Sequence, residues 1–371
     1  MAVASNGDVF VISNRGGGGR GRAGAATPPP RGVFRLRDAN GDGKADTALL
    51  VASSTGAGIW IANNALYAEA GGTMILRYPF RGNTTDFTGV VDTIVTGLPT
   101  GGHATRDIVV RGNELFVNIG SNGNVCGGRG SPDPCPDLAT RAGLWKFDAT
   151  RTGQAYSPAQ RYATGIRNGT ALTLNPRDNQ IYVTTHGRDN LIQWNGNNDE
   201  YNAENPGEEF FKVVEGAAYP WPYCYYSHEL KKQVTAPEYG GDGKADARCA
   251  SLQKPIYAFP GHWAPNAALF YTGTQFPAAY REGIFIAFHG SWNRAPLPQA
   301  GFNLTFLPMR DGKAAGAHQV FASGFSGRLT ANSPPDAPNR RPAGVAQLRD
   351  GSLLVSDDQG GSIFRIVYTG R

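Results

Sequence analysis

The stretch DNQIYV at residues 178–183 decides the fold, because it joins a turn rich in Asp and Asn to a short strand of β-branched and aromatic residues. The unit recurs five more times with the same order of turn and strand. The other copies are NGDVFVI at 6–12, NALY at 64–67, GNELFV at 112–117, EGIFI at 282–286 and DGSLLV at 350–355. A unit found six times predicts an architecture that is built by repetition.

Further strands flank the repeated unit. A second apolar strand is predicted after most copies, at 74–78, 144–147, 191–194, 304–307 and 363–367. One more apolar strand precedes several copies, at 106–110, 171–174 and 344–348. Six sheets of three or four strands predict an all-β fold, a six-bladed β-propeller, in which radial repetition leaves only short, protected sheet edges. A β-sandwich is the competing architecture, but it does not need six copies of one unit.

The uneven spacing of the copies locates the insertions. The widest gap separates Ile181 from Ile284 and contains an aromatic, proline-rich stretch. We therefore expect a long loop insertion at about 195–263 on one face of the propeller, where function usually lies. No linker divides the chain, so we expect a single domain over residues 1–371.

The composition limits the classes of function. Of the 371 residues, 50 are Gly, 25 are Pro and only 18% are charged, which argues against long helices as the main architecture and against disorder. The formal net charge is +5, yet the arginines form no dense block, so we expect no nucleic-acid partner. A small ligand with several negative charges fits better. No apolar run reaches the roughly 18 residues of a membrane span, so we expect no transmembrane segment.

The four cysteines lie in loops rich in Gly, Pro and Asp. Three pairings are possible, and free buried thiols are the alternative, but closeness along the chain favours the bridges Cys126–Cys135 and Cys224–Cys249. Disulfides indicate an oxidising compartment. We therefore expect a periplasmic or secreted protein, with no signal peptide in this sequence.

The stretch at 38–46 resembles the first half of a calcium-binding loop. Oxygen-bearing groups recur at every second position around a Gly turn, and they belong to Asp38, Asn40, Asp42, Lys44 (through its main-chain oxygen) and Asp46. A polar hairpin whose side chains cap turns is an equally good interpretation, because the bidentate Glu of a complete helix–loop–helix site is absent.

Histidines and arginines gather at the ends of predicted strands. His103, His186 and His289 each lie beside polar residues or glycine, just before or after a repeated strand. A single histidine of this kind is more often structural than catalytic. Arginines at comparable positions favour a functional role for these histidines. Because strand ends line the funnel of a propeller, the histidines and arginines together predict a cationic rim around one axis. These arginines are Arg106, Arg167, Arg188, Arg294, Arg340 and Arg341.

Several motifs in a fixed order carry a family resemblance. They are GH at 102–103, GIRN at 165–168, YPWPYCYY at 219–226, HWAP at 262–265, FHGSWNR at 288–294 and RPAGV at 341–345. This order resembles the soluble sugar dehydrogenases that depend on pyrroloquinoline quinone (PQQ), in particular the L-sorbosone dehydrogenase-like and aldose sugar dehydrogenase branch. The resemblance covers nearly the whole chain and implies a six-bladed propeller that binds PQQ and Ca²⁺ at the top of its axis.

The resemblance also implies roles for single residues. His103 matches the general base of the family, and Ser121 stands where some members have an aspartate that orients this base. Gly187 and Arg188 match positions whose main-chain oxygens hold Ca²⁺. The residues that we expect to bind the cofactor are Arg106, Arg167, Asn168, Trp263, His289, Asn293, Arg294 and Arg341.

The residue types suit this chemistry. PQQ carries three carboxylates, which arginine binds well, and a histidine can take the substrate hydroxyl proton while hydride goes to the quinone. We expect a dehydrogenase that oxidises a sugar, a polyol or a sugar aldehyde and passes electrons to an external acceptor, a cytochrome or a quinone. Two alternatives stay open: a metal-dependent sugar lactonase on a similar propeller, and a non-enzymatic propeller that binds carbohydrate or protein.

Overall fold

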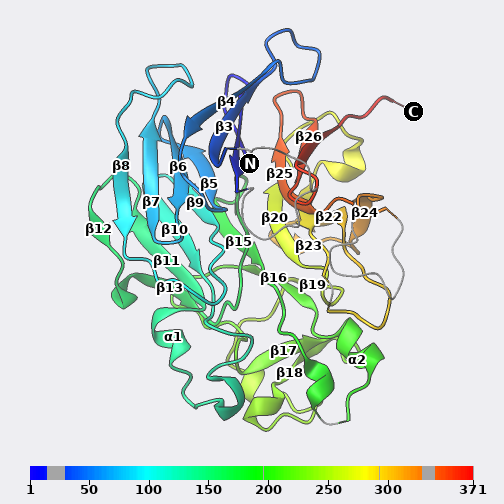
Figure 1. The fold of residues 1–371 in the computed structure, drawn as a ribbon. Helices are drawn as coiled ribbons and strands as arrows, with labels where there is room; N and C mark the ends of the chain where they lie inside the picture. Colours follow the sequence, from blue (N-terminus) through cyan, green and yellow to red (C-terminus); the bar gives the residue numbers. More distant parts are fainter. Residues whose placement is uncertain (15–29, 195, 292, 328–338, 371) are drawn as a thin grey trace.

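The structure is a computed structural model that describes residues 1–14, 30–194, 196–291, 293–327 and 339–370. It is nearly all-β, and six small sheets are arranged as the blades of a six-bladed propeller, as the sequence predicts (Figure 1). Within these residues the two α-helices are short and lie in loops, α1 (Asp137–Thr140) and α2 (Asp199–Glu204). No helix in the described ranges is both long enough and apolar enough to span a membrane.

Apart from β12, the strands of each blade follow the order of the chain from the propeller axis outward. Blade one contains β1 (Ala2–Val3), β2 (Val9–Ser13), β3 (Gly32–Arg37) and β4 (Thr47–Ala52). Blade two contains β5 (Ile59–Ala62), β6 (Ala65–Ala70), β7 (Met74–Pro79) and β8 (Asp92–Thr96), with β12 (Gln154–Ala155) added at its edge. Blade three contains β9 (Ile108–Arg111), β10 (Glu114–Ile119), β11 (Gly143–Asp148) and β13 (Arg161–Thr164).

The other three blades follow the same plan. Blade four contains β14 (Ala171–Asn175), β15 (Gln180–Thr184), β16 (Glu208–Lys212) and β19 (Tyr257–Phe259). Blade five contains β20 (Pro265–Phe270), β21 (Gly283–Phe288), β22 (Asn303–Arg310), β23 (Lys313–Ala314) and β24 (Gln319–Ala322). Blade six contains β25 (Pro342–Gln347), β26 (Leu353–Asp357) and β27 (Ser362–Ile366).

The six repeated sequence units all form the second strand of a blade, namely β2, β6, β10, β15, β21 and β26. The innermost strands form a closed ring, because β1 contacts β5, and β9, β14, β20 and β25 follow in turn until β25 contacts β1. Because the ring is closed, every blade packs against a neighbour on each side, and this packing stabilises the repeated unit.

A separate hydrophobic cluster fills the space between neighbouring blades. Tyr182 and Val183 on β15 illustrate the pattern, since successive side chains of a strand point to opposite faces. Tyr182 packs with Ile286 of blade five, while Val183 packs with Phe116 of blade three. Burying a side chain of this size contributes about 1.5–3 kcal/mol. The second strands are therefore apolar on both faces.

Residues 191–194, which we expect as a strand, form a 3₁₀ turn at Leu191–Gln193 instead. Leu191 packs with Tyr225 and Val234, under the hairpin of β17 (Cys224–Ser227) and β18 (Lys232–Thr235), so its apolar side chain does not serve a blade. The third strand of blade four is β16.

The stretch at about 195–263, expected as a loop insertion, contains two blade strands, β16 and β19. Residue 195 itself lies outside the described residues. The hairpin of β17 and β18 lies between these two strands in the chain. The insertion is therefore shorter than the expected stretch, because the apolar runs of β16 and β19 within it belong to blade four.

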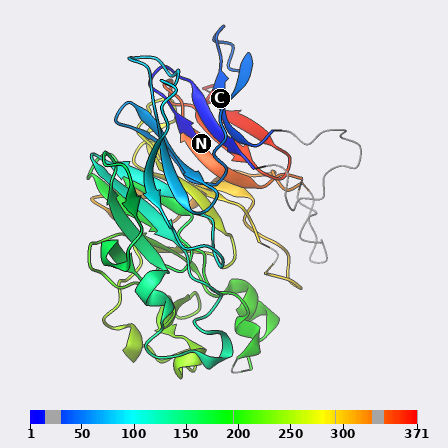
Figure 2. The ribbon, with the colours of Figure 1, turned by 60° about the vertical axis from the view of Figure 1, so that its left-hand side comes forward.

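Both expected disulfides are present, Cys126–Cys135 and Cys224–Cys249. The described residues contain no free cysteine. Helices α1 and α2 and the hairpin of β17 and β18 lie together at one end of the molecule, and β3 and β4 lie toward the other end (Figures 1 and 2). The disulfide-bonded loops thus cover one end of the propeller.

Candidate functional site

One end of the ring collects the predicted histidines and arginines. Inner strands β9, β14, β20 and β25 begin at this end, and β15 and β21 end there, because neighbouring strands of a blade are antiparallel. We call it the funnel end. The residues just beyond these strand ends are His103, Arg167, Asn168, His186, Gly187, Arg188, His262, Trp263, His289 and Arg341.

The predicted calcium loop at 38–46 does not belong to the funnel end. It joins β3 to β4, and β3 runs away from the funnel end because it is antiparallel to β2. The Asp38 carboxylate accepts two backbone N–H groups of the loop at 2.8 Å each, and Asp46 accepts those of Ala39 and Asn40. The five predicted ligands of this loop therefore take no part in the funnel, and calcium binding by the loop stays a prediction.

His103 is held at the mouth of blade three by Ser121. Its backbone N–H donates to the Ser121 carbonyl at 2.9 Å, and its Nδ1 lies 2.9 Å from Ser121 Oγ. Ser121 Oγ donates its own proton to the Gly123 carbonyl at 2.6 Å, so the hydroxyl accepts from the imidazole. The imidazole proton is thereby placed on Nδ1, and Nε2 keeps the lone pair of a base.

Two glycines allow this close approach. A Cβ on Gly102 would lie 2.5 Å from the Ser121 carbonyl oxygen, and one on Gly120 would lie 2.6 Å from the His103 Cβ.

Burial first, and then the charge of Arg167, lower the pKa of His103 to about 4. The histidine is therefore neutral near pH 7, which is the state that a proton acceptor requires.

Arg167 is buried and ties together the loops beside His103. Its Nε donates to the Asn124 carbonyl at 3.2 Å, and its Nη1 donates to the Gly187 carbonyl at 2.8 Å. Nη2 donates to Asn124 Oδ1 at 2.9 Å and to Asp189 Oδ2 at 3.1 Å. One guanidinium thus fixes the loop after β10 and the loop after β15 in place.

Asn168 has an incomplete environment. It is only 8% exposed, and its carbonyl accepts the backbone N–H of His186 at 2.9 Å, but its side-chain Oδ1 has no hydrogen-bond partner among the described residues. A buried polar atom without a partner costs about 1–3 kcal/mol. A donor group on a bound ligand would remove this cost.

The backbone at Gly187 and Arg188 is held from several sides. The Gly187 N–H donates to Glu208 Oε2 at 2.7 Å, and the Arg188 side chain lies 2.6 Å from Glu238 Oε1, with both charged groups buried. Glu238 therefore neutralises Arg188, which adds little to a cationic rim. A small pocket lies beside these residues, and Trp221 forms part of its wall.

Arg341 contributes from blade six. Its Nε donates to the His289 carbonyl at 3.1 Å and its Nη2 to the Gly290 carbonyl, while its Cζ lies 5.7 Å from the centre of the Phe302 ring. His289 turns its own Nε2 toward Asp358 at 2.9 Å. The guanidinium of Arg341 is thus oriented by two carbonyls, which bind it without neutralising its charge.

Three other expected cofactor residues hold parts of the protein itself. Arg106 is 1% exposed and donates to the Gly72 carbonyl at 3.0 Å. Trp263 packs edge-on against the core residue Phe288. Arg294 donates to a main-chain carbonyl of α2 at 2.6 Å and lies 2.5 Å from a carboxylate oxygen on the same helix. Cofactor binding by these three residues stays a prediction.

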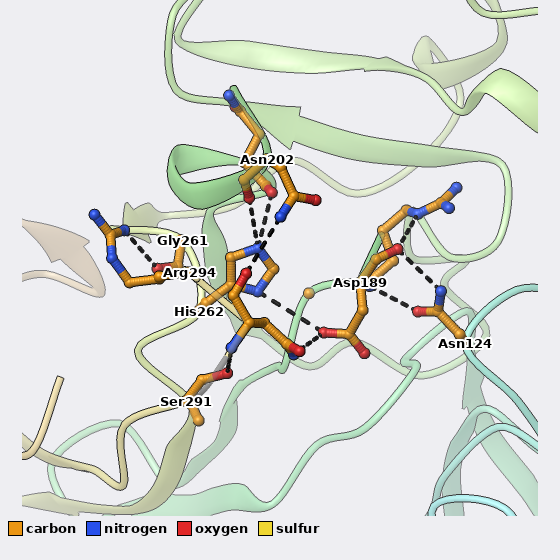
Figure 3. Close-up of polar contacts among 12 residues, drawn as sticks. Asn124, Asp189, Asn202, Gly261, His262, Ser291 and Arg294 are labelled. Carbon is orange, nitrogen blue, oxygen red and sulfur yellow. Dashed lines mark hydrogen bonds and ion pairs between the residues drawn. The ribbon is translucent and has the colours of Figure 1, made fainter. Parts of the chain in front are cut away.

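Asp189 belongs to the polar cluster drawn in Figure 3, and the sequence analysis does not single it out. Its carboxylate accepts bonds from Arg167 and Asn293 and lies 3.8 Å from His262 Nδ1. Its backbone N–H donates to Asn124 Oδ1 at 2.7 Å. The sequence could have pointed to Asp189, because it directly follows a predicted calcium position. Nothing in the sequence points to Asn124, because its partners lie in other blades.

A family model matches most of the chain, and curated relatives match part of it. The family model described as TrAA12-like matches residues 32–369. An uncharacterized protein of Borreliella burgdorferi is 31% identical over 273 residues, which make up 72% of this chain and 61% of that protein. A pyrroloquinoline quinone-dependent pyranose dehydrogenase of Coprinopsis cinerea is 27% identical over 319 residues, 74% of this chain and 41% of the relative. The chain thus spans only part of the length of these relatives.

Solved structures share the propeller fold. The holo form of the pyranose dehydrogenase PQQ domain from Coprinopsis cinerea has a TM-score of 0.74 at 22% identity, covering 99% of this chain and 91% of that chain. The calcium structure of the Trichoderma reesei carbohydrate-active enzyme of family AA12 has a TM-score of 0.73 at 20% identity, covering 98% and 96%. The PQQ-bound aldose sugar dehydrogenase of Streptomyces coelicolor has a TM-score of 0.57 at 15% identity, covering 99% and 91%.

Proposed function

Since the chain belongs to the TrAA12-like family, we propose that it is a PQQ- and Ca²⁺-dependent oxidoreductase that oxidises a sugar, a polyol or a sugar aldehyde. The electrons pass to an external acceptor, a cytochrome or a quinone. The names of the relatives support PQQ and a sugar substrate, since they include a pyranose dehydrogenase and an aldose sugar dehydrogenase.

The observation that carries the proposal is the state of His103. Ser121 places the imidazole proton on Nδ1, and burial keeps the ring neutral, so Nε2 is a base at the funnel end. A site that only binds carbohydrate or protein does not need a histidine prepared in this way. The geometry therefore favours an enzyme with a proton acceptor.

The residues at the funnel end fit an anionic cofactor. Arg341 presents a positive charge, and no carboxylate of the described residues lies within hydrogen-bond distance of its guanidinium. Asn168 Oδ1, which has no partner among the described residues, would accept a hydrogen bond from a donor group of the cofactor. Arg341 and Asn168 would hold PQQ, while Arg167, which is already paired with Asp189, would keep the neighbouring loops in place. The family resemblance assigns Ca²⁺, which prefers oxygen ligands, to the main-chain oxygens of Gly187 and Arg188. The Gly187 carbonyl already accepts Arg167 Nη1 at 2.8 Å, so calcium at this position stays a proposal.

PQQ, when bound, supplies an electrophilic quinone that accepts hydride from the substrate carbon. His103 Nε2 accepts the proton of the substrate hydroxyl as this hydride departs. Ser121 keeps the imidazole in the required tautomer throughout, because its own proton is committed to Gly123. The low pKa of His103 then favours release of the proton to solvent, which returns the base to its neutral form.

Reconstitution tests the proposal. Purified protein is incubated with PQQ and Ca²⁺, and reduction of an artificial dye is followed with aldoses, polyols and sugar aldehydes. Activity that requires PQQ supports the proposal, and absence of activity with every substrate overturns it. The same preparation is tested with sugar lactones and a divalent metal, and lactone hydrolysis without dye reduction would support the lactonase alternative.

A further inference from the structure

Arg141 directly follows α1, and its side chain reaches the loop that leads into His103. We infer that it is a positioning residue, which holds this loop so that the imidazole of His103 stays against Ser121. The inference rests on the proposed function and deepens it, because it names a group that keeps the proposed base in place. Arg141 binds main-chain oxygens of the loop, so it acts on the reaction through His103.

The loop before His103 has little stiffness of its own. Gly101 and Gly102 follow one another in it, with φ 79° and φ 61°. Glycine loses more backbone freedom on folding than any other residue, so such a loop needs contacts from elsewhere to keep one conformation. The position of His103 therefore depends on the groups that bind residues 99–102.

Arg141 supplies two of these contacts. Its Nη1 donates to the Gly101 carbonyl at 3.2 Å, and its Nη2 donates to the Thr100 carbonyl. A planar guanidinium binds two acceptors in a fixed geometry, which orients both peptide groups. One residue earlier, the Pro99 carbonyl accepts a hydrogen bond from Arg106. Arginine side chains thus hold three successive carbonyls just before His103.

α1 also reaches the partner of the base. Asp137, the first residue of α1, accepts the backbone N–H of Asn122 at 2.9 Å through its carboxylate. Asn122 directly follows Ser121, whose hydroxyl lies 2.9 Å from His103 Nδ1. The helix and the residue after it therefore hold the chain on both sides of the contact between His103 and Ser121.

α1 has anchors of its own. Leu138 packs against the cluster that contains the Cys126–Cys135 bridge. The Tyr156 hydroxyl donates to the Thr140 carbonyl at 2.6 Å. These contacts keep α1 in place, so Arg141 extends from a fixed point toward the loop.

Arg161 of β13 provides a matched control. Its Nη1 donates to the Leu138 carbonyl, so it is a second arginine that binds α1. Its side-chain hydrogen bonds to described residues go to α1, and none goes to the loop at 99–102. Arg161→Ala thus removes an arginine contact from the same helix without touching the loop before His103.

The pKa of His103 reports whether the ring stays in place. Burial is the main cause that lowers it to about 4, and the charge of Arg167 is the second, whereas Ser121 and Asp189 act in the opposite direction. A displaced ring gains contact with water, which favours the charged form and raises the pKa toward the ordinary value of about 6.5. Substitution of Arg141 leaves Arg167 and Asp189 unchanged, so a raised pKa indicates lost burial.

The experiment compares Arg141→Ala, Arg141→Lys and Arg161→Ala with the wild type in the absence of PQQ. NMR follows the titration of His103, whose resonance is identified by its loss in His103→Gln, and circular dichroism shows that each protein is folded. The pKa of His103 should rise toward about 6.5 in Arg141→Ala and stay at the wild-type value in Arg161→Ala. Arg141→Lys keeps the charge but not the planar fork, so part of the rise should remain.

Kinetics after reconstitution add a second measurement. A misplacement of about 1 Å can cost a reaction about a hundredfold. In Arg141→Ala kcat should therefore fall by about ten- to a hundredfold, while KM changes little because Arg141 does not bind the substrate. Arg161→Ala should keep the kcat of the wild type.

A wild-type pKa of His103 in Arg141→Ala would overturn the inference, whatever the activity of the variant. An equal rise in Arg161→Ala would overturn it too, since the effect would then be one of helix stability, and so would no rise in Arg141→Lys, since the effect would be one of charge. If Arg141→Ala does not fold, Arg141→Lys decides in its place. The titration needs neither PQQ nor substrate, so a wild type without dye reduction overturns the proposed function and not the result of the titration.

Discussion

Lowering the pH to about 5 should leave kcat/KM of the reconstituted enzyme almost unchanged, because His103 stays neutral there. Burial and the charge of Arg167 lower its pKa to about 4. With this pKa about 90% of the base is neutral at pH 5, whereas an ordinary histidine pKa of about 6.5 would leave only about 3%. A lowered pKa of the base moves the loss of activity to lower pH. At pH 5 the neutral fraction of His103, and with it kcat/KM, is about thirtyfold higher than for a base with the ordinary pKa.

The assay measures initial rates of dye reduction at substrate concentrations well below KM, in overlapping buffers from neutral to acid pH, with PQQ and Ca²⁺ at saturation. Circular dichroism at each pH shows whether the protein is still folded. An acid limb centred near pH 6.5 in folded protein would refute the reasoning, because it would mean that the base is an ordinary, solvated histidine or another group. His103→Gln, which cannot titrate, should lose this limb together with most of the activity.

Three further predictions concern the same site and its loops. His103→Ala should bind PQQ nearly as the wild type does, yet lose about 10²–10⁴-fold in kcat, and equal turnover would remove His103 from the mechanism. Arg341→Ala should weaken PQQ binding by about ten- to a hundredfold in a titration at fixed Ca²⁺, with Arg341→Lys recovering part of the loss; unchanged affinity would contradict its role as an anchor. Replacing Cys224 and Cys249 by Ser opens a loop of sequence separation 25 and should lower the free energy of unfolding by about 2–4 kcal/mol in denaturant titrations, and an unchanged midpoint would contradict this.

The blades could be predicted from the sequence because a blade is a local object. A turn, a short apolar strand and a neighbouring strand lie close together in the chain, so stretches such as 112–117 and 350–355 already show what they form. The disulfide loops are local in the same sense, because each bridge joins two cysteines that are neighbours in the order of cysteines along the chain. The apolar runs in and just before the long insertion do not show which of them form blade strands. Leu191 packs under the hairpin of β17 and β18, whereas β16 forms the third strand of blade four.

The sequence by itself thus determined the six-bladed propeller, the two disulfides and the collection of histidines and arginines at strand ends. Only the tertiary structure decided what each of these side chains binds. Arg294 turns to α2, Arg106 turns to a neighbouring loop, and Asp189 unites three blades. The physical reason is that strand formation depends on side chains a few residues apart, whereas the direction of a long polar side chain depends on acceptors that folding brings from other blades.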